Sequence, residues 1–343
     1  MLANVDIHSQ KHIQLNLCDD LFYSHRNSSL LSSFPLKEYK FIDLFAGVGG
    51  IRIAFDELGA ECVFSSEWDK YSQITYEANY GTKPHGDITK ISAEEVPAFD
   101  ILLAGFPCQP FSNAGHKKGF EDARGTLFFD ICRLVDYHKP KVLFLENVKG
   151  FKGHNKGQTF QVVKDSLKNL GYSVHTQVLN AKNFGVPQNR ERIYIIAFKE
   201  KNFFQFPIWQ EQHVNVGMIL EEMVDDKYTL SDKLWMGHKR RKEEHLIKGN
   251  GFGYSLFNHN SPYTSTISAR YYKDGSEILI EQLGKNPRKL TPREAARLQG
   301  FPDDFVIPVS DAQAYKQFGN SVAVPVIRAI AQEICYALKE NQA

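Results

Sequence analysis

Long apolar runs are missing from this 343-residue chain, and that absence limits the cellular compartments in which we expect the protein. No stretch of roughly 18 residues is continuously apolar, so the sequence predicts no membrane-spanning helix. The N-terminal segment MLANVDIHSQKHIQ lacks the unbroken apolar core that a secretory signal requires. Both absences favour a cytoplasmic protein.

Cysteine is scarce and its spacing excludes two classes of small site. The five cysteines, at positions 18, 62, 108, 132 and 335, are odd in number and include no C-x-x-C pair. This pattern argues against a disulfide framework and a zinc knuckle, and favours free thiols in a reducing compartment. We therefore expect no metal site.

The chain also has almost no net charge. Lys and Arg number 41 against 40 Asp and Glu, which leaves a formal charge of +1 and excludes a strong global field. If nucleic acid is the partner, the positive charge that binds it must be local. Apolar residues make up 42% and charged residues 24%, which is ordinary for a globular protein of about two domains.

Over the first two thirds of the chain, short apolar runs alternate with segments in which apolar residues recur at helical spacing. Strands are expected at 41–45, 62–67, 101–104, 142–145 and 193–198, and helices at 51–59, 126–138, 290–298 and 324–338. Near-continuous apolar strands separated by helices predict an α/β fold with a parallel sheet. The helix behind Thr291 and Pro292 has an N-cap residue followed by proline at its first position.

Two regions lack this alternation. Residues 1–39 are polar and weakly patterned, and we interpret them as an N-terminal extension. Residues 204–287 are aromatic and loop-rich, with the densest basic run at 239–242. That run is either a solvated face or a phosphate-binding surface.

A glycine turn follows the first strand, but the dinucleotide fingerprint is incomplete. After Gly47 and Gly49, the third glycine of G-x-G-x-x-G is replaced by Arg52, which disfavours a nicotinamide dehydrogenase. Glu67 follows Gly47 by twenty residues, where an acidic residue can bind ribose hydroxyls. Trp68 offers an aromatic face, and Asp87 an acceptor for an exocyclic amine. Together they suit adenosine without a pyrophosphate.

A second set of residues follows other strand ends, where parallel sheets place their ligands. Cys108 lies in a loop, so it is either a nucleophile or a small buried side chain. Glu146 ends the strand at 142–145 and is either functional or a solvated turn residue. Arg190 and Arg192 alternate by two, which puts them on one face.

Six blocks in one order carry a family resemblance. They are FAGVGG at 45–50, Glu67-Trp68, FPCQPFS at 106–112, Glu146-Asn147-Val148, PQNRER at 187–192 and FGNSV at 318–322. Their order and spacing resemble the C5-cytosine DNA methyltransferases over about residues 40–200 and 288–343. Residues 249–254 and 266–275 resemble the target-recognition region of the Dcm-type branch, which reads CCWGG or CCNGG and modifies the inner cytosine.

The resemblance implies a Rossmann-like sheet that binds S-adenosylmethionine, with a small target-recognition domain inserted. The expected divisions are an extension at 1–39, a catalytic domain at 40–200, a recognition domain at 201–304 and a return segment at 305–343. The chain must return because the FGNSV block belongs to the cofactor site.

The resemblance also implies a chemistry. Cys108 matches the nucleophile that adds to C6 of cytosine, and Glu146 the residue that holds N3 and the exocyclic amine. Arg192 resembles the arginine that contacts the flipped base and steadies the thiolate side, and Arg190 its neighbour near the substrate backbone. The products are 5-methylcytosine and S-adenosylhomocysteine.

The implied binding residues fall into two groups. Cofactor contacts are expected from Phe45, Gly47, Gly49, Gly50, Glu67, Trp68, Asp87, Ile88, Pro107, Asn320 and Val322. Contacts to double-stranded DNA are expected from Ser112, Arg124, Arg240 and Arg270, with Arg288, Lys289, Arg293 and Arg297 as further candidates for phosphate contact. Arg270 either reads a guanine or holds a phosphate. We expect a monomer whose partner is DNA, with a restriction endonuclease of the same site as a possible companion outside any stable complex.

Two rival functions share much of this pattern. One is a tRNA cytosine methyltransferase of the same fold, which would use the same Cys108 chemistry. The other is a catalytically inactive, DNA-binding regulatory relative, which an intact set of Cys108, Glu146 and Arg192 disfavours.

Overall fold

The computed structural model describes residues 35–107, 127–201, 203–208, 213–251 and 253–340. Cys108, Ser112 and Arg124 lie outside the described residues, as do residues 1–34 of the expected extension.

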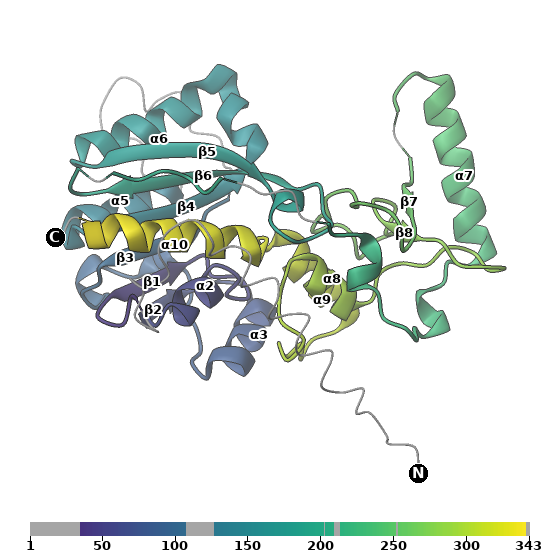
Figure 1. The fold of residues 1–343 in the computed structure, drawn as a ribbon, viewed down its shortest axis with the longest axis horizontal. Helices are drawn as coiled ribbons and strands as arrows, with labels where there is room; N and C mark the ends of the chain where they lie inside the picture. The colour runs from purple at the N-terminus through teal and green to yellow at the C-terminus, as the bar shows by residue number, and fades with distance from the viewer. Residues whose placement is uncertain (1–34, 108–126, 202, 209–212, 252, 341–343) are drawn as a thin grey trace, which may run out of the picture.

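A six-stranded sheet organises the first two thirds of the chain (Figure 1). Its strands are β1 Lys40–Leu44, β2 Glu61–Ser66, β3 Ile101–Gly105, β4 Val142–Val148, β5 Ser173–Asn180 and β6 Glu191–Phe198, in the order β2-β1-β3-β4-β6-β5. The pairs β2–β1, β1–β3 and β3–β4 are parallel, as predicted.

The predicted parallel pairing does not extend to β6, and β5 was not predicted. β6 pairs antiparallel with both β4 and β5. β5 and β6 are joined by a short loop rather than a crossover helix, and a short connection between neighbouring strands produces antiparallel pairing. β5 is an edge strand with the sequence SVHTQVLN, mostly half-buried, so it lacks the apolar run that marked the other strands.

Helices cover both faces of the sheet. The helices of the described chain are α2 Arg52–Glu57, α3 Lys70–Tyr80, α5 Leu127–His138, α6 Gln158–Asn169, α7 Asp232–Ile247, α8 Pro292–Leu298, α9 Asp311–Asn320 and α10 Val324–Glu340, and those that pack on the sheet are α2, α5, α6 and α10. Short 3-10 turns lie at Ile88–Lys90, Ala93–Glu95, Lys149–Gly157, Ala181–Asn183, Val216–Ile219 and Asp226–Tyr228.

The alternation of side chains along each strand builds two separate cores. Phe41 of β1 and Phe144 of β4 pack on one face with α2 and α10, and Ile42 and Leu143 pack on the other with α5 and α6. Figure 1 shows α10 running across the sheet beside α2. Because both faces are covered, these strands are buried at nearly every position.

The helix α10 explains an apolar stretch near the C-terminus. A window of 18 residues within Asp311–Glu340 has a mean hydropathy of 1.4, which is sufficient by composition for a membrane span. In the structure this stretch is two helices, and the apolar residues of α10 lie in the core of the sheet. Its hydropathy reflects a core helix.

The region beyond the sheet has a third core. It joins Ile267, Tyr271 and Ile280 to residues of α8 and α9, and also contacts Val48 beside the glycine turn. The two short strands β7 Leu256–Phe257 and β8 Leu279–Ile280 lie here and pair in parallel. The predicted domain boundaries remain predictions.

The helix α7 falls where loops were expected and carries the basic run 239–242. Its N-cap Ser231 accepts a hydrogen bond from the Leu234 N–H at 3.4 Å. Within this helix only His238 is buried, so the sequence shows no apolar stripe that would have predicted it. Figure 1 shows α7 at the far side of the recognition region, away from the sheet.

Candidate active site

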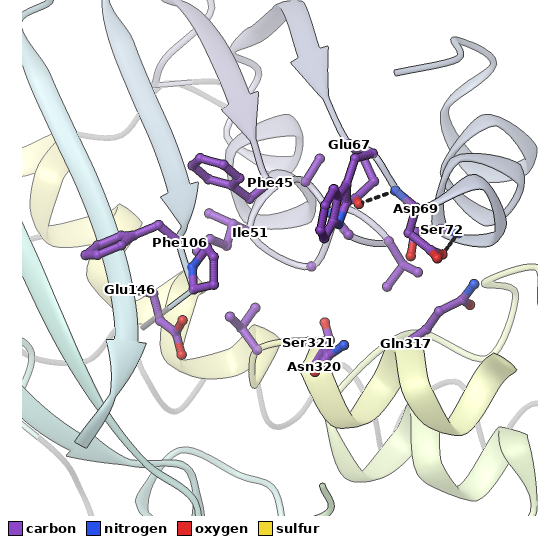
Figure 2. Close-up of a pocket in the computed structure, with 18 of the residues that line it drawn as sticks. Phe45, Ile51, Glu67, Asp69, Ser72, Phe106, Glu146, Gln317, Asn320 and Ser321 are labelled. Atoms are coloured by element: carbon purple, nitrogen blue, oxygen red, sulfur yellow. Dashed lines mark hydrogen bonds between the residues drawn. The ribbon is translucent and has the colours of Figure 1, made fainter. Parts of the chain in front are cut away.

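The carboxyl ends of the parallel strands open onto one cavity of about 800 Å³ (Figure 2). Parallel strands present these ends at a common edge, so residues from distant parts of the chain meet there. The sequence-predicted residues that line the cavity are Phe45, Gly47, Gly50, Glu67, Trp68, Asp87, Ile88, Pro107, Glu146, Arg190, Arg192, Asn320 and Val322.

The glycine turn between β1 and α2 is set by close contacts. Gly47 and Gly49 have φ angles of +55° and +82°, which residues other than glycine rarely adopt. A Cβ on Gly50 would lie 2.7 Å from Ser321 Oγ, so only glycine lets the C-terminal segment approach the turn.

Gly49 differs from its expected role as a cofactor contact. It does not line the cavity, and a Cβ there would lie 2.3 Å from the ring of Tyr80. The Tyr80 hydroxyl donates to the Gly49 carbonyl oxygen at 2.9 Å. Gly49 therefore shapes the glycine turn through its contact with Tyr80, outside the cavity.

Glu67 is held by backbone donors in the cavity wall. The N–H of Gly47 donates to Oε2 and the N–H of Asp69 donates to Oε1, both at 2.8 Å. Burial raises the pKa of this carboxyl, and the two backbone donors partly oppose the rise. Each carboxylate oxygen keeps a lone pair for a ligand hydroxyl.

Another part of the cavity wall combines polar and apolar side chains, those of Asp87, Ile88 and Trp68. The Thr89 side chain and backbone N–H donate to Asp87 Oδ1 at 2.8 Å and 3.1 Å, and the side-chain bond is the main cause that lowers the pKa of Asp87. Ile88 is buried, while Trp68 is 78% exposed and offers a free aromatic face. An ionised acceptor beside an aromatic ring suits a purine.

Glu146 lies at the opposite end of the cavity from Asp69 and Ser72 in Figure 2. It is buried at the end of β4, and its Oε1 lies 3.2 Å from Arg192 Nε. Burial raises the pKa of the Glu146 carboxyl, while Arg192 and Arg190 act in the opposite direction. A buried carboxyl with a raised pKa can hold a proton near neutral pH and donate it.

Asn147, beside Glu146, anchors the loop that leads to Cys108. Its Nδ2 donates to the Phe106 carbonyl oxygen at 2.9 Å, and its Oδ1 accepts from the Val148 N–H at 2.8 Å. The side chain is buried. Asn147 thus fixes the backbone immediately before Pro107.

Arg190 is placed differently from its expected position near the substrate backbone. It is buried, and its terminal nitrogens donate to the carbonyl oxygens of Ile267 at 3.1 Å, Gly319 at 3.2 Å and Ser321. Burial is the main cause that lowers the pKa of Arg190. Its Nε lacks a partner in the described part of the chain. Arg190 therefore holds the segment around Ile267 and the C-terminal segment against the sheet.

The recognition segment around Ile267 is seated on this junction. The Ile267 N–H donates to Gln188 Oε1 at 3.1 Å, and the Asn189 N–H donates to the Thr264 carbonyl at 2.9 Å. A Cβ on Gly319 would lie 2.3 Å from the Ser268 carbonyl carbon, so glycine is required there. These contacts fix the chain three residues before Arg270.

The candidates for DNA contact that the structure describes differ in position. Arg270 is exposed and lies outside the cavity. Arg240 is exposed on α7, with Nε 3.5 Å from Glu244 Oε1. Arg288, by contrast, is buried in an ion pair with Glu294 at 2.7 Å, so it is wrong as a phosphate contact.

Sequence reasoning missed part of the cavity wall. Asp69 and Ser72 of α3 and Gln317 of α9 also line it. The Thr75 hydroxyl donates to Gln317 Oε1 at 3.0 Å, which joins residues 242 positions apart. The FGNSV block lies beside Gln317 in the sequence and was the signal that could have suggested it.

Residues 39–336 match the family described as C-5 cytosine-specific DNA methylase. The chain belongs to this family. It is a DNA (cytosine-5)-methyltransferase, as the six sequence blocks predicted, and its fold is the Rossmann-like fold of S-adenosylmethionine-dependent methyltransferases.

Curated relatives of this methyltransferase are bacterial Type II enzymes. It is 62% identical over 306 residues to Type II methyltransferase M.SsoII of Shigella sonnei, covering 88% of this chain and 81% of the relative. It is 58% identical over 311 residues to M1.ScrFI of Lactococcus lactis subsp. cremoris, with 89% and 80% covered. M.NlaX of Neisseria lactamica is 62% identical over 304 residues, with 88% and 97% covered.

Solved structures support the fold of the methyltransferase. The S. pombe Dnmt2 methyltransferase superposes with a TM-score of 0.73 at 20% identity, covering 89% of this chain and 100% of that one. Entamoeba histolytica EhMeth gives 0.72 at 20% identity, with 88% and 98% covered. At this identity the likeness shows the shared fold.

Proposed function

We propose that this methyltransferase modifies C5 of a cytosine rotated out of double-stranded DNA, through a covalent bond between Cys108 and C6 of the base. The observation that supports this most directly is the single cavity that holds the Glu67 end and the Glu146 end together. A nucleoside cofactor and a flipped base can meet in such a cavity.

The cavity fits S-adenosylmethionine on three features. Glu67 keeps acceptor lone pairs for ribose hydroxyls, Asp87 offers an ionised acceptor, and Gly50 makes room for the C-terminal segment. Gln317 also lines this cavity, and its buried Nε2 has no partner among the described residues. When bound, the cofactor supplies an electrophilic methyl group.

Glu146 assists the nucleophile. C5 of cytosine is a weak nucleophile until a thiolate adds to C6, and addition is easier when N3 receives a proton. The buried Glu146 carboxyl, with its raised pKa, is suited to hold and donate that proton. After transfer the C5 proton leaves to water, its electron pair re-forms the C5–C6 double bond and expels the Cys108 thiolate, and the N3 proton returns to the Glu146 carboxylate.

Arg192 orients Glu146 and adds positive charge beside the base. Its Nε lies 3.2 Å from Glu146 Oε1, and its Nη1 donates to the Glu191 carbonyl at 2.8 Å. These contacts fix the guanidinium at the cavity wall. Positive charge there favours the thiolate form of the attacking sulfur.

The DNA lies against the recognition region in this proposal. The target carbon is hidden in a stacked duplex, so the base must rotate into the cavity. Arg240 and Arg270 are exposed on that region, and Ser112 and Arg124 belong to the segment after Cys108. The enzyme acts as a monomer in the cytoplasm, and a restriction endonuclease of the same site is a possible companion outside any stable complex.

The proposed target is the inner cytosine of a CCNGG- or CCWGG-like site. Support comes from the Dcm-type likeness of residues 249–254 and 266–275, with Arg270 inside the second segment. An arginine in the major groove reads guanine through O6 and N7. The segment is held close to the catalytic residues by Gln188 and Arg190.

Bisulfite sequencing of a randomised-site plasmid from expressing cells tests the activity and the site together. We expect 5-methylcytosine at the inner position of CCNGG-like sites, and a Cys108→Ser variant should give none. Methylation confined to GCGC or GGCC would overturn the site. A methyl signal in tRNA with unmodified plasmid would support the tRNA rival, and no transfer with retained DNA binding would support the inactive relative.

Arg270→Ala separates base reading from phosphate contact. Loss of a guanine contact should cost about 1–3 kcal/mol at one base position and relax selectivity there. Arg240→Ala serves as the phosphate-type comparison, which should weaken methylation of all sites alike. An Arg270→Ala enzyme that is weaker but equally selective would place Arg270 with the phosphate contacts.

A further inference from the structure

Gln317 lines the cavity and carries a buried hydrogen-bond donor that has no partner among the described residues. Its side chain is 5% exposed, and its Nε2 has no partner among the described residues. Among the described residues that line the cavity, only Gln317 Nε2 and Arg190 Nε are buried side-chain nitrogens without a partner. A buried amide without a partner destabilises the folded state, so it indicates a ligand atom that completes the bond.

The orientation of the Gln317 amide is set from the other side. The hydroxyl of the fully buried Thr75 donates to Gln317 Oε1 at 3.0 Å. This bond directs the oxygen toward α3 and leaves both hydrogens of Nε2 for another acceptor. Figure 2 shows the Gln317 side chain reaching from α9 toward Asp69 and Ser72.

Gln317 therefore lies at the end of the cavity that Glu67 occupies. Asp69 and Ser72 belong to the same end of the cavity as Glu67. The Asp69 N–H donates to Glu67 Oε1 at 2.8 Å, and Asp69 Oδ1 accepts from the Ser72 N–H at 2.9 Å. Glu146 lies at the opposite end (Figure 2). The position favours a contact with the nucleoside part of the cofactor over a contact with the reacting base.

Donors and acceptors at this end are complementary to a ribose. A ribose hydroxyl that donates its proton to Glu67 keeps lone pairs on its own oxygen, and these need a donor. We propose that Gln317 Nε2 donates to a ribose hydroxyl oxygen of S-adenosylmethionine and completes the ribose site with Glu67. This assignment rests on the cofactor of the proposed function.

Calorimetric binding of S-adenosylhomocysteine tests the assignment without turnover. Gln317→Met removes the donor at nearly the same volume, and Gln317→Glu keeps the acceptor for Thr75 while removing the donor. We expect both variants to bind the ligand about tenfold more weakly, as for one lost hydrogen bond. The matched control is Gln332→Glu on α10, because Gln332 also has a buried unpaired Nε2 but does not line the cavity.

Ligand analogues identify the partner atom. An analogue that lacks the contacted ribose hydroxyl should bind wild type and Gln317→Met equally, whereas an analogue without the carboxylate should keep the tenfold difference. If the difference disappears only with the decarboxylated analogue, Gln317 binds the carboxylate and the ribose assignment is wrong. Equal affinity of wild type and both variants for S-adenosylhomocysteine would also overturn it.

Two outcomes separate this assignment from the proposed function. A wild-type enzyme that does not bind S-adenosylhomocysteine would refute the cofactor itself. If the Gln317 variants unfold, Thr75→Val reports on the same contact, because loss of the orienting hydroxyl should weaken binding by about threefold. Unchanged affinity in a folded Thr75→Val enzyme would then count against the assignment.

Discussion

Replacing Arg190 with lysine tests whether this buried arginine holds the site together or takes part in the chemistry. Its terminal nitrogens donate to three carbonyl oxygens, those of Ile267, Gly319 and Ser321. A lysine ammonium is a point donor and cannot reproduce the planar fork. At least two of the carbonyls should therefore lose their donor.

The magnitude follows from that count. Each buried polar group left without a partner costs about 1–3 kcal/mol, so Arg190→Lys should lower the free energy of unfolding by about 2–6 kcal/mol. Cofactor affinity should also fall, because Ser321 and its neighbours Asn320 and Val322 line the cavity. Urea unfolding measures the first quantity, and calorimetry with S-adenosylhomocysteine measures the second.

Arg293→Lys is the matched control for this experiment. Arg293 also donates to two carbonyl oxygens, those of Pro302 at 3.2 Å and Phe305 at 2.7 Å, but it is partly exposed and does not line the cavity. Its replacement should cost no more than about 1 kcal/mol, because water can satisfy the exposed carbonyl. An Arg190→Lys enzyme with wild-type stability and cofactor affinity but no methyl transfer would refute the reasoning and restore a catalytic role.

Three further predictions follow from the site and its surroundings. Glu146→Gln should lower kcat by about 10²–10⁴-fold. Because the folded-state pKa of Glu146 is raised, wild-type kcat/KM should fall as the pH rises through that pKa, and a pH profile of the variant that keeps this limb would contradict the role. Asp87→Ala should weaken S-adenosylhomocysteine binding by about 1–3 kcal/mol in calorimetry while sparing DNA binding, and unchanged affinity would make Asp87 a turn residue. Arg288→Met should lower the free energy of unfolding by about 3–5 kcal/mol in urea, because Glu294 is left charged and buried. The control Arg297→Met breaks a more exposed ion pair and should cost about 1 kcal/mol or less. Equal costs of the two substitutions would refute the burial argument.

Much of the sheet could be predicted from the sequence because burial on both faces leaves a strong signal. β1, β3 and β4 are buried at nearly every position, and the structure places them within three residues of their predicted bounds. β5 and α7 could not be found in this way, since each is mostly exposed or half-buried. The direction of β6 depends on which strand lies beside it, and local composition carries no information about that.

The sequence by itself determined the family and its reaction, through six ordered blocks, and most of the cavity wall, because Glu67 follows β2 and Glu146 lies near the end of β4, where parallel strands face a ligand. Only the tertiary structure decided what the other groups do. Gln317 meets α3 across 242 residues, and Arg190 meets three carbonyls from two distant segments. Backbone carbonyls and buried amides have no signature in the sequence, so their partners exist only once the chain has folded.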